Sequence, residues 1–404
     1  MRIGIGLNLF TPDAGGVANY VVTLLRHWPE FAPQHQLVLF TFDHNEAMLS
    51  QLPPESRRHE LRVQTQEDML QHLDKIDVYF CPFNTLWPRP VPLPTVITFT
   101  DMQERFYPQF FTAKQLEERF HHYDWSLRMT DVVIAISDFT KRSCVDIVGI
   151  SPRKIRTIHL SPDDLPAPRE PAGWSAAGWE KFVYYPANFW EHKNHLRLLR
   201  ALRQLADEGL PVRCVFTGSV FGREAAWDAA VAETGTADLV RHLGRRPRAE
   251  LSWLFRRARA VVLPSLFEGF GIPAVEAMHC DCPIACSGGT SLPEVVKDAA
   301  VYFDPRDESA IARAIAQLWN DDALCTDLVA RGRRRGTYFN SRRLVESHVE
   351  AFALARRRFH PWKHWYRRKF LLPKSATPRT ALSPHETAAA QRLLRKLDLN
   401  GRAS

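Results

Sequence analysis

Two series of short apolar runs, separated by one segment rich in proline and glycine, constrain the fold of this chain more than any other feature. In the first series the runs lie at residues 2–10, 36–42, 78–81, 95–100, 132–135 and 154–159. In the second series they lie at residues 182–185, 212–217, 260–263, 283–285 and 300–303. Stretches with apolar residues at helical spacing lie between the runs, as at 17–28 and 196–205, and this alternation is typical of parallel strands joined by helices.

The segment between the two series, residues 166–180, shows little periodicity and predicts a linker. We therefore expect one Rossmann-like domain at residues 1–165 and a second at residues 181–340. A helix at residues 341–358 and a tail at residues 359–404 would follow. The length of 404 residues suits two α/β domains of ordinary size.

The composition bears on the compartment and on metal binding. The N-terminal apolar run is too short for a signal peptide, and no apolar stretch approaches the ~20 residues that span a bilayer. Seven cysteines, an odd number, favour reduced thiols and a cytoplasmic location. Three of them, Cys280, Cys282 and Cys286, lack the spacing of a zinc site, so we expect small buried residues there and no metal.

The segment at residues 264–278 carries the most informative pair of residues. Glu268 precedes Pro273 and Glu276 follows it, and proline suits the first turn of a helix. Glu268 should therefore lie on a loop, and Glu276 on the first turns of the helix. The loop follows the apolar run at 260–263, and open α/β sheets bind ligands beyond the carboxyl ends of their strands.

Both glutamates have the chemistry of a ligand site. A carboxylate can accept two hydrogen bonds side by side, which matches the vicinal hydroxyls of a ribose. The backbone amides of Gly269, Phe270 and Gly271 could approach such a ligand closely, because glycine has no Cβ. The alternative is two surface glutamates around a helix start, since a pair at this spacing often arises by chance.

The context favours a ligand site. Residues 258–278, 282–296 and 299–305 together resemble glycosyltransferase family 4 (group 1). The resemblance extends from Tyr184 to about Phe339 and is weaker in the N-terminal half. It implies the α/β GT-B fold, in which two Rossmann-like domains face each other across a cleft and a C-terminal helix returns to the N-terminal domain. It also implies a retaining enzyme that takes a hexose from a nucleotide-diphosphate sugar.

The resemblance assigns the donor to the C-terminal domain and the acceptor to the N-terminal domain. It implies that Glu276 holds the ribose of the donor and that Glu268 acts as a catalytic residue on the hydroxyls of the transferred sugar. The loop whose amides would face the sugar and the diphosphate contains Gly289, Thr290, Ser291 and Leu292.

Lys193 is the expected cation of the site. A fixed positive charge stabilises the charge that develops on a departing diphosphate. The family usually has an arginine where this chain has Asn188, so more of that task would fall to Lys193. The sequence contains no D-x-D pair, and we expect metal-independent catalysis without a cofactor other than the nucleotide sugar itself.

The N-terminal half contributes two further candidates. Gly15 and Gly16 open a helix, where backbone N–H groups and the helix dipole attract anions, and they resemble the glycine loop of the family. Asp101 occupies the place of a family aspartate near the reacting sugar, with Thr100 where a histidine is usual. Asp101 could act in catalysis or simply cap the following helix.

The net charge of +8 is concentrated in arginine clusters. We interpret residues 245–259 as a solvated face. Residues 356–372 mix arginines with Trp362, Trp365, Tyr366, Phe370 and Leu371, which suits docking on an anionic membrane surface at the inner face of the cell membrane. Neither cluster has a recognisable base-stacking platform, so we expect no nucleic-acid partner.

We therefore expect a glycosyltransferase that acts on a saccharide or lipid-linked saccharide in cell-surface polysaccharide or lipopolysaccharide synthesis, with mannose as the favoured hexose. A sugar-nucleotide epimerase and a catalytically silent subunit with the same fold stay open as alternatives. An oxidoreductase would need a glycine fingerprint, and Gly4 and Gly6 lack its third glycine.

Overall fold

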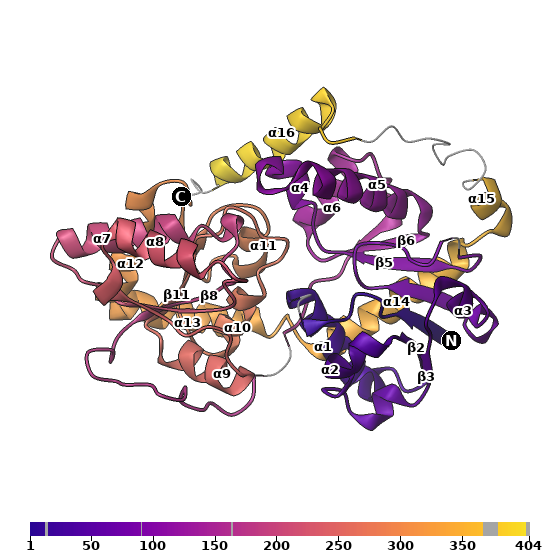
Figure 1. Cartoon of the computed structure of the whole chain (residues 1–404), viewed down its shortest axis with the longest axis horizontal. Coiled ribbons are helices and arrows are strands. Elements are labelled where there is room, and N and C mark those ends of the chain that lie inside the picture. The colour runs from indigo at the N-terminus through magenta and orange to yellow at the C-terminus, as the bar shows by residue number, and fades with distance from the viewer. Residues whose placement is uncertain (13–14, 90, 163–164, 367–378, 401–404) are drawn as a thin grey trace. The chain divides into compact units, whose positions relative to one another are not determined.

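The chain folds into two units. The computed structural model describes residues 1–12, 15–89, 91–162, 165–366 and 379–400. The first unit comprises Met1–Asp163 together with Phe339–Leu393, and the second contains Asp164–Tyr338 (Figure 1).

A seven-stranded parallel sheet forms the centre of the first unit, in the order β3-β2-β1-β4-β5-β6-β7. Its strands are β1 (Arg2–Gly6), β2 (Gln36–Thr41), β3 (Glu60–Arg62), β4 (Val78–Cys81), β5 (Thr95–Phe99), β6 (Val132–Ala135) and β7 (Ile155–Thr157). In the register of the central strands, Ile3 pairs with Leu37 on one side and with Val78 on the other. Every residue of β4, β5 and β6 is buried, as is usual in a parallel sheet with both faces covered.

The helices of the first unit come from both ends of the chain. They are α1 (Gly16–Phe31), α2 (Glu46–Leu49), α3 (Gln66–Leu70), α4 (Gln103–Phe106), α5 (Ala113–Met129), α6 (Asp138–Asp146), α14 (Ser341–Arg358), α15 (Pro361–Tyr366) and the first part of α16 (Pro384–Asn400). Helix α14 packs against α1 and along β4, β5 and β6 (Figure 1). The prediction of a C-terminal helix that returns to the N-terminal domain is thus confirmed.

The face of α14 that meets the sheet is aromatic. The ring of Phe352 lies 5.2 Å from that of Phe80 and 6.1 Å from that of Trp28, between ring centroids. One turn earlier, His348 Nε2 lies 2.5 Å from the hydroxyl of Tyr20. Burial lowers the pKa of His348 to about 4, so its ring is neutral at physiological pH and can be buried without a counter-charge.

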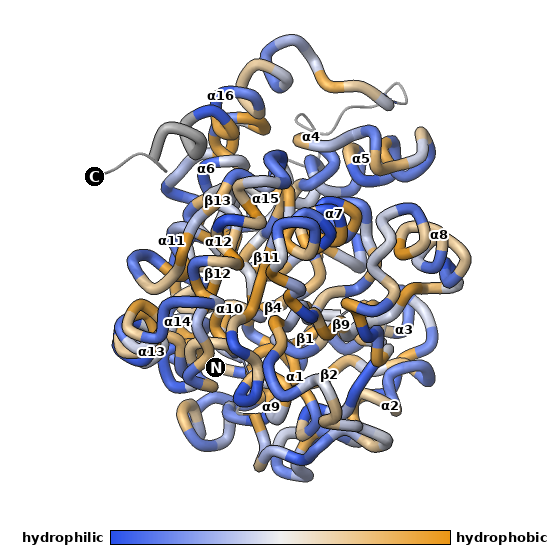
Figure 2. The backbone as a smooth tube through the Cα atoms, turned by 90° about the vertical axis from the view of Figure 1, so that its left-hand side faces the viewer, coloured by the Kyte–Doolittle hydropathy of each residue, from blue (hydrophilic) through white to orange (hydrophobic). Residues whose placement is uncertain are grey.

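A six-stranded parallel sheet forms the centre of the second unit, in the order β10-β9-β8-β11-β12-β13. Its strands are β8 (Val183–Pro186), β9 (Cys214–Thr217), β10 (Val240–His242), β11 (Ala260–Leu263), β12 (Ile284–Ser287) and β13 (Val301–Phe303). The helices are α7 (His195–Asp207), α8 (Glu224–Thr234), α9 (Arg248–Arg257), α10 (Ile272–His279), α11 (Leu292–Val296), α12 (Glu308–Asn320) and α13 (Asp322–Gly336). Figure 2 shows β11 and β4 as largely hydrophobic segments, in keeping with their burial.

Two strands were not expected from the sequence. Strands β3 and β10 are three residues long, lie at sheet edges and contain no fully buried residue. Such strands need no apolar run, because only their backbone pairs with a neighbour. All seven cysteines are buried free thiols. In the described part of the chain, no helix combines the length and the hydrophobicity needed to cross a lipid bilayer.

We predict that Phe352→Ala destabilises the first unit by about 3–5 kcal/mol, because it removes a buried ring from the contact between α14 and the sheet. Unfolding in urea, followed by circular dichroism, measures the change. Trp362→Ala is the control, since Trp362 lies shortly after α14 and is 65% exposed. Equal stabilities of the two variants would contradict the role of α14 in this core.

Candidate functional site

The predicted donor-site residues follow three strands of the second unit. The loop after β8 carries Lys193, the loop after β11 carries Glu268, and the loop after β12 carries Thr290. Because β8, β11 and β12 are neighbours and run parallel, their carboxyl ends lie at one edge of the sheet. The fold therefore brings together three segments that are far apart in the sequence.

Lys193 and Glu268 form an ion pair, with Nζ 2.7 Å from Oε1. The same oxygen accepts a 2.7 Å hydrogen bond from the hydroxyl of Ser265. The side chains of Lys193 and Glu268 are only 19% and 12% exposed, so solvent screens this pair less than a surface pair. The two residues that were expected to act on the diphosphate and on the sugar are thus in direct contact.

The backbone around Lys193 is fixed by residues that the sequence analysis did not single out. Asn194 has a left-handed conformation, with φ of 62°, and its side-chain amide donates to the carbonyls of Pro264 and Pro305 at 2.9 and 2.7 Å. The hydroxyl of Tyr185 donates to the carbonyl of Lys193 at 2.6 Å. Asparagine tolerates the left-handed region better than most residues, which is the one local signal for its role.

Glu268 is also tied to the loop after β12. Its backbone N–H donates to the hydroxyl of Thr290 at 3.1 Å, and the hydroxyl of Ser291 donates to its carbonyl at 2.9 Å. Thr290 and Ser291 are both buried. These bonds use the two hydroxyls to hold the loops together, and they orient the backbone of Glu268.

Glu276 lies in α10 and is 7% exposed. Burial raises the pKa of its carboxyl group, while Arg248 opposes that shift through an ion pair of 3.2 Å between Nη1 and Oε1. The interpretation of residues 245–259 as a solvated face is therefore wrong for Arg248. It is also wrong for Arg259, which is 16% exposed in its side chain and pairs with Asp322 at 2.6 Å.

The glycine segment before α10 packs tightly. Gly271 precedes the helix with φ of 98°, and a Cβ at this position would lie 2.6 Å from Cδ2 of Leu292. Gly269 and Phe270 lie beside it, and the ring of Phe270 is buried. Gly289, by contrast, is partly exposed, and a Cβ added there would meet no atom within 4 Å.

Asn188 follows β8 but takes no part in the hydrogen bonds of Lys193 and Glu268. Its Oδ1 accepts from the backbone N–H of Ser219 at 2.8 Å, which links the loops after β8 and β9. This contact gives Asn188 a structural function in the loop. Its side chain carries no positive charge.

The candidates of the first unit also lie at the carboxyl ends of strands. Asp101 follows β5, and its Oδ1 accepts the N–H of Gln103 at 3.2 Å, as a residue at a helix start does. Thr100 is buried and donates from its hydroxyl to Oδ1 of Asn84 at 2.9 Å. Gly15, with φ of 60°, and Gly16 begin α1 as predicted, and the positive φ explains a glycine at that place.

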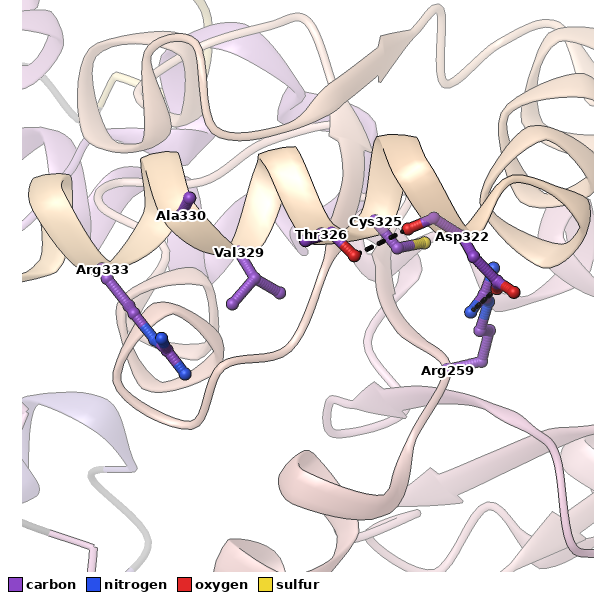
Figure 3. Close-up of a pocket in the computed structure, with 7 residues that line it drawn as sticks. All are labelled: Arg259, Asp322, Cys325, Thr326, Val329, Ala330 and Arg333. Carbon is purple, nitrogen blue, oxygen red and sulfur yellow. Dashed lines mark hydrogen bonds and ion pairs between the residues drawn. The ribbon is translucent and has the colours of Figure 1, made fainter.

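A pocket of about 460 Å³ lies elsewhere in the second unit, along α13 (Figure 3). The residues that line it are Arg259, Asp322, Cys325, Thr326, Val329, Ala330 and Arg333. None of the residues predicted for the donor site is among them. The candidate site thus lies on the loops at the sheet edge and not in this pocket.

Known proteins resemble this chain over both of its units. The profile of group 1 glycosyl transferases matches residues 168–335, and that of glycosyltransferase family 4 matches residues 14–164. O-antigen chain mannosyltransferase B of Escherichia coli is 30% identical over 269 residues, which are 64% of this chain and 70% of that protein. O-antigen chain mannosyltransferase RfbU of Salmonella typhimurium is 27% identical over 225 residues, 55% of this chain and 60% of that protein.

Among solved structures, HepE of Anabaena in complex with UDP and glucose superposes with a TM-score of 0.67. The sequence identity is 16%, and the match covers 87% of this chain and 99% of that chain. At this identity the likeness concerns the fold, and it confirms the predicted GT-B architecture.

We predict that Gly271→Ala lowers the free energy of unfolding by about 1–3 kcal/mol, because it forces a positive φ on alanine and pushes a Cβ against Leu292. Gly289→Ala should change stability by less than about 0.5 kcal/mol, since its Cβ would meet open space. Thermal unfolding of the two variants side by side measures the difference. Equal losses would show that the segment before α10 is not as closely packed as described.

Proposed function

Since the chain belongs to the group 1 glycosyltransferases of family 4, we propose that it transfers a hexose, with mannose favoured, from a nucleotide-diphosphate sugar. The acceptor is a saccharide or lipid-linked saccharide of a cell-surface polysaccharide or lipopolysaccharide. Family membership favours this activity over the oxidoreductase, epimerase and silent-subunit alternatives. The observation that carries the proposal is the partly buried pair of Lys193 and Glu268 at the edge of the second sheet.

In this proposal the second unit binds the donor. Glu276 accepts hydrogen bonds from the ribose hydroxyls, and Glu268 accepts hydrogen bonds from hydroxyls of the hexose. The amides of Gly269 to Gly271 and of Gly289 to Leu292 face the sugar and the diphosphate. The mannosyl specificity of two similar proteins, both O-antigen chain mannosyltransferases, supports mannose as the transferred sugar.

Lys193 has two anionic partners in this scheme. Its ammonium group has three donors, and one of them already meets Glu268. A bound diphosphate would compete for Lys193, and the lysine would then stabilise the charge of the leaving group in place of a metal ion. The leaving phosphate oxygen could take the proton of the acceptor hydroxyl on the same face of the sugar, which retains the anomeric configuration without a covalent enzyme intermediate.

In this proposal the first unit binds the acceptor. Gly15 and Gly16 at the start of α1 offer backbone N–H groups to an anion, and Asp101 would contact the reacting groups from the end of β5. Its Oδ1 also accepts the N–H of Gln103, which holds Asp101 at the start of α4.

We predict that Glu268→Ala lowers kcat by about 100- to 1,000-fold, the loss typical of one polar group that acts on a transition state. Glu276→Ala should chiefly weaken donor binding. Thermal shifts with a panel of nucleoside-diphosphate sugars, varied in base and hexose, measure binding, because a true donor raises stability by mass action. Transfer assays with the best donor measure kcat.

The control for both variants is Glu224→Ala, an exposed glutamate at the start of α8 in the same unit. It should bind and react like the parent protein. If the Glu268 and Glu276 variants also glycosylated the acceptor at the parent rate, the donor site would have to lie elsewhere.

The tail gives a second part of the proposal, which is peripheral docking of this cytoplasmic enzyme on an anionic membrane surface. Trp362 and Trp365 of α15 are 65% and 47% exposed, with ring centroids 5.7 Å apart. They follow the basic last turn of α14, Arg356 to Arg358. Exposed tryptophans beside arginines suit the headgroup region, where rings and phosphates lie close together. Phe370 and Leu371, also expected to contribute, lie outside the described residues.

We predict that the protein co-sediments with phosphatidylglycerol vesicles but not with phosphatidylcholine vesicles. Trp362→Ala combined with Trp365→Ala should lower the bound fraction at least several-fold, and raised salt should lower it further. Trp190→Ala, which removes a 45% exposed tryptophan of the second unit, is the matched control. Binding that ignores both the salt and the double substitution would rule out this surface.

A further inference from the structure

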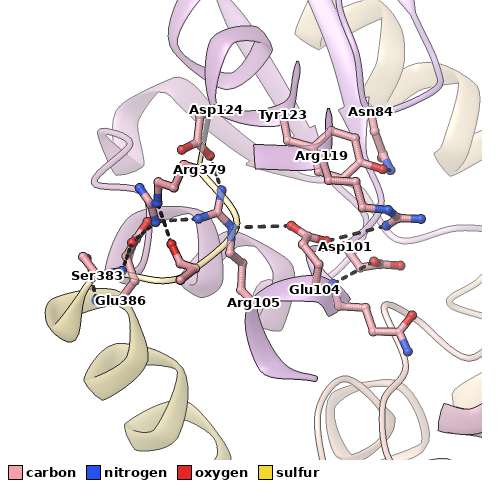
Figure 4. Close-up of polar contacts among 12 residues, drawn as sticks. Asn84, Asp101, Glu104, Arg105, Arg119, Tyr123, Asp124, Arg379, Ser383 and Glu386 are labelled. Carbon is pink, nitrogen blue, oxygen red and sulfur yellow. Dashed lines mark hydrogen bonds and ion pairs between the residues drawn. The ribbon is translucent and has the colours of Figure 1, made fainter. Parts of the chain in front are cut away.

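A buried arginine joins three helices of the first unit, as Figure 4 shows. Arg105 lies in α4, and its side chain is 1% exposed. Its Nη2 lies 2.7 Å from Oδ1 of Asp124 in α5, and its Nη1 lies 3.0 Å from Oε1 of Glu386 in α16. The guanidinium also covers the ring of Phe120, 3.8 Å from the centroid. A buried cation needs such partners, because removal from water without them is costly.

The carboxylate of Glu386 is held in place by its own turn. Its Oε2 accepts the backbone N–H of Ser383 at 2.8 Å and pairs with Arg379, and the backbone N–H of Glu386 donates to the hydroxyl of Ser383 at 3.3 Å. This is a capping box at the start of α16. One oxygen thus fixes the helix start, and the other is available to Arg105.

The first half of α16 is packed as well as charged. Ala389, Ala390 and Leu393 are buried, and Glu386 is 6% exposed. The contact between Arg105 and Glu386 joins residues 281 positions apart. Helix α16 lies beyond the residues that the two family profiles match, 14–164 and 168–335, whereas Arg105 lies within them.

On its other side Arg105 faces Glu104. The Nε atom of Arg105 lies 3.5 Å from Oε1, and Nη1 of Arg119 lies 3.6 Å from Oε2, distances too long for good hydrogen bonds. Burial raises the pKa of Glu104 to about 7; Arg105 and Arg119 oppose the shift, and Asp101 adds to it. The charge of Arg105 is therefore shared between Glu104 and the two closer carboxylates.

We propose that Glu386 is a positioning residue for glycosyl transfer. It holds Arg105, and Arg105 holds α4, whose first residue Gln103 donates its N–H to Asp101. Residues 379–393 thereby act on the carboxyl end of β5, where the first unit would meet its substrate. The effect on catalysis rests on the proposed function of Asp101, whereas the effect on α4 does not.

Glu386→Gln in the full chain tests the inference. The neutral amide should weaken the tie to Arg105, so amide hydrogens of residues 103–107 should exchange faster. We expect kcat to fall by about 10- to 100-fold, as small misplacements of reacting groups do, with the KM for the donor unchanged. Glu386→Asp keeps the charge but shortens the reach, and should show an intermediate loss.

The pH dependence of stability gives a second readout of the tie between Glu386 and Arg105, beside the loss of kcat at an unchanged KM. The raised pKa of Glu104 means that the folded state binds more protons than the unfolded state between pH 4.5 and about 7, so this group lowers stability as pH rises. Without Glu386, Arg105 acts more strongly on Glu104 and lowers its pKa, so the slope between pH 5 and 7 should become shallower. The other titratable groups that interact with Glu104 are Asp101, Arg119, Tyr123 and Cys144, which the variant keeps. Asp124, whose pKa Glu386 helps to raise, should shift downward together with Glu104.

Two comparisons make the result decisive. Arg392→Gln removes a charge from the exposed face of the same helix and should match the parent in exchange, kcat and pH slope. Parent-like exchange of residues 103–107 and parent-like kcat in Glu386→Gln would overturn the inference. If Asp101→Asn kept full activity, the proposed role of Asp101 would be overturned. Faster exchange in Glu386→Gln would still support the positioning of α4 in that case.

Discussion

In both units the strands run parallel, so after each strand the chain must return, in most cases along a helix, to the edge where the strand began. Every loop that follows a strand therefore emerges at the opposite edge, whatever its position in the sequence. In the second unit this constraint brings Lys193 to Glu268 across 75 positions, and in the first it places Thr100 and Asp101 beside the loop that carries Asn84. The chemistry of the chain depends on this geometry more than on any single contact.

The charges at the edge of the second sheet are balanced within the protein itself. Lys193 is neutralised by Glu268, and Glu276 by Arg248. Each candidate group thus has a partner that a bound nucleotide sugar would partly replace. Breaking such a pair lowers the affinity for a ligand, but the pair stabilises the free protein, which unpaired buried charges would destabilise. The two ion pairs thus compensate the charges of Lys193 and Glu276 in the free protein.

Much of this arrangement could be predicted from the sequence. The buried strands, the helix that begins beside Pro273 and the loop position of Glu268 follow from local patterns. The partners do not: Arg248 is one arginine among many in a basic stretch, and nothing in the residues around it points to Glu276. The link between Arg105 and Glu386 is also invisible locally, because it joins two helices from opposite ends of the chain. Edge strands such as β3 lack the apolar run by which buried strands are found.

The position of α14 has a consequence for how the protein is made. The first unit needs this helix, since Tyr20 meets His348 at a separation of 328 residues. At roughly 5–20 residues per second, translation takes on the order of 20–60 s to cover that distance. During that time the strands of the first sheet have been synthesised, but the helix that covers them has not. The residues of the second unit are synthesised in between. The first unit can therefore complete its core only after the second unit has been synthesised, although its own strands are made first.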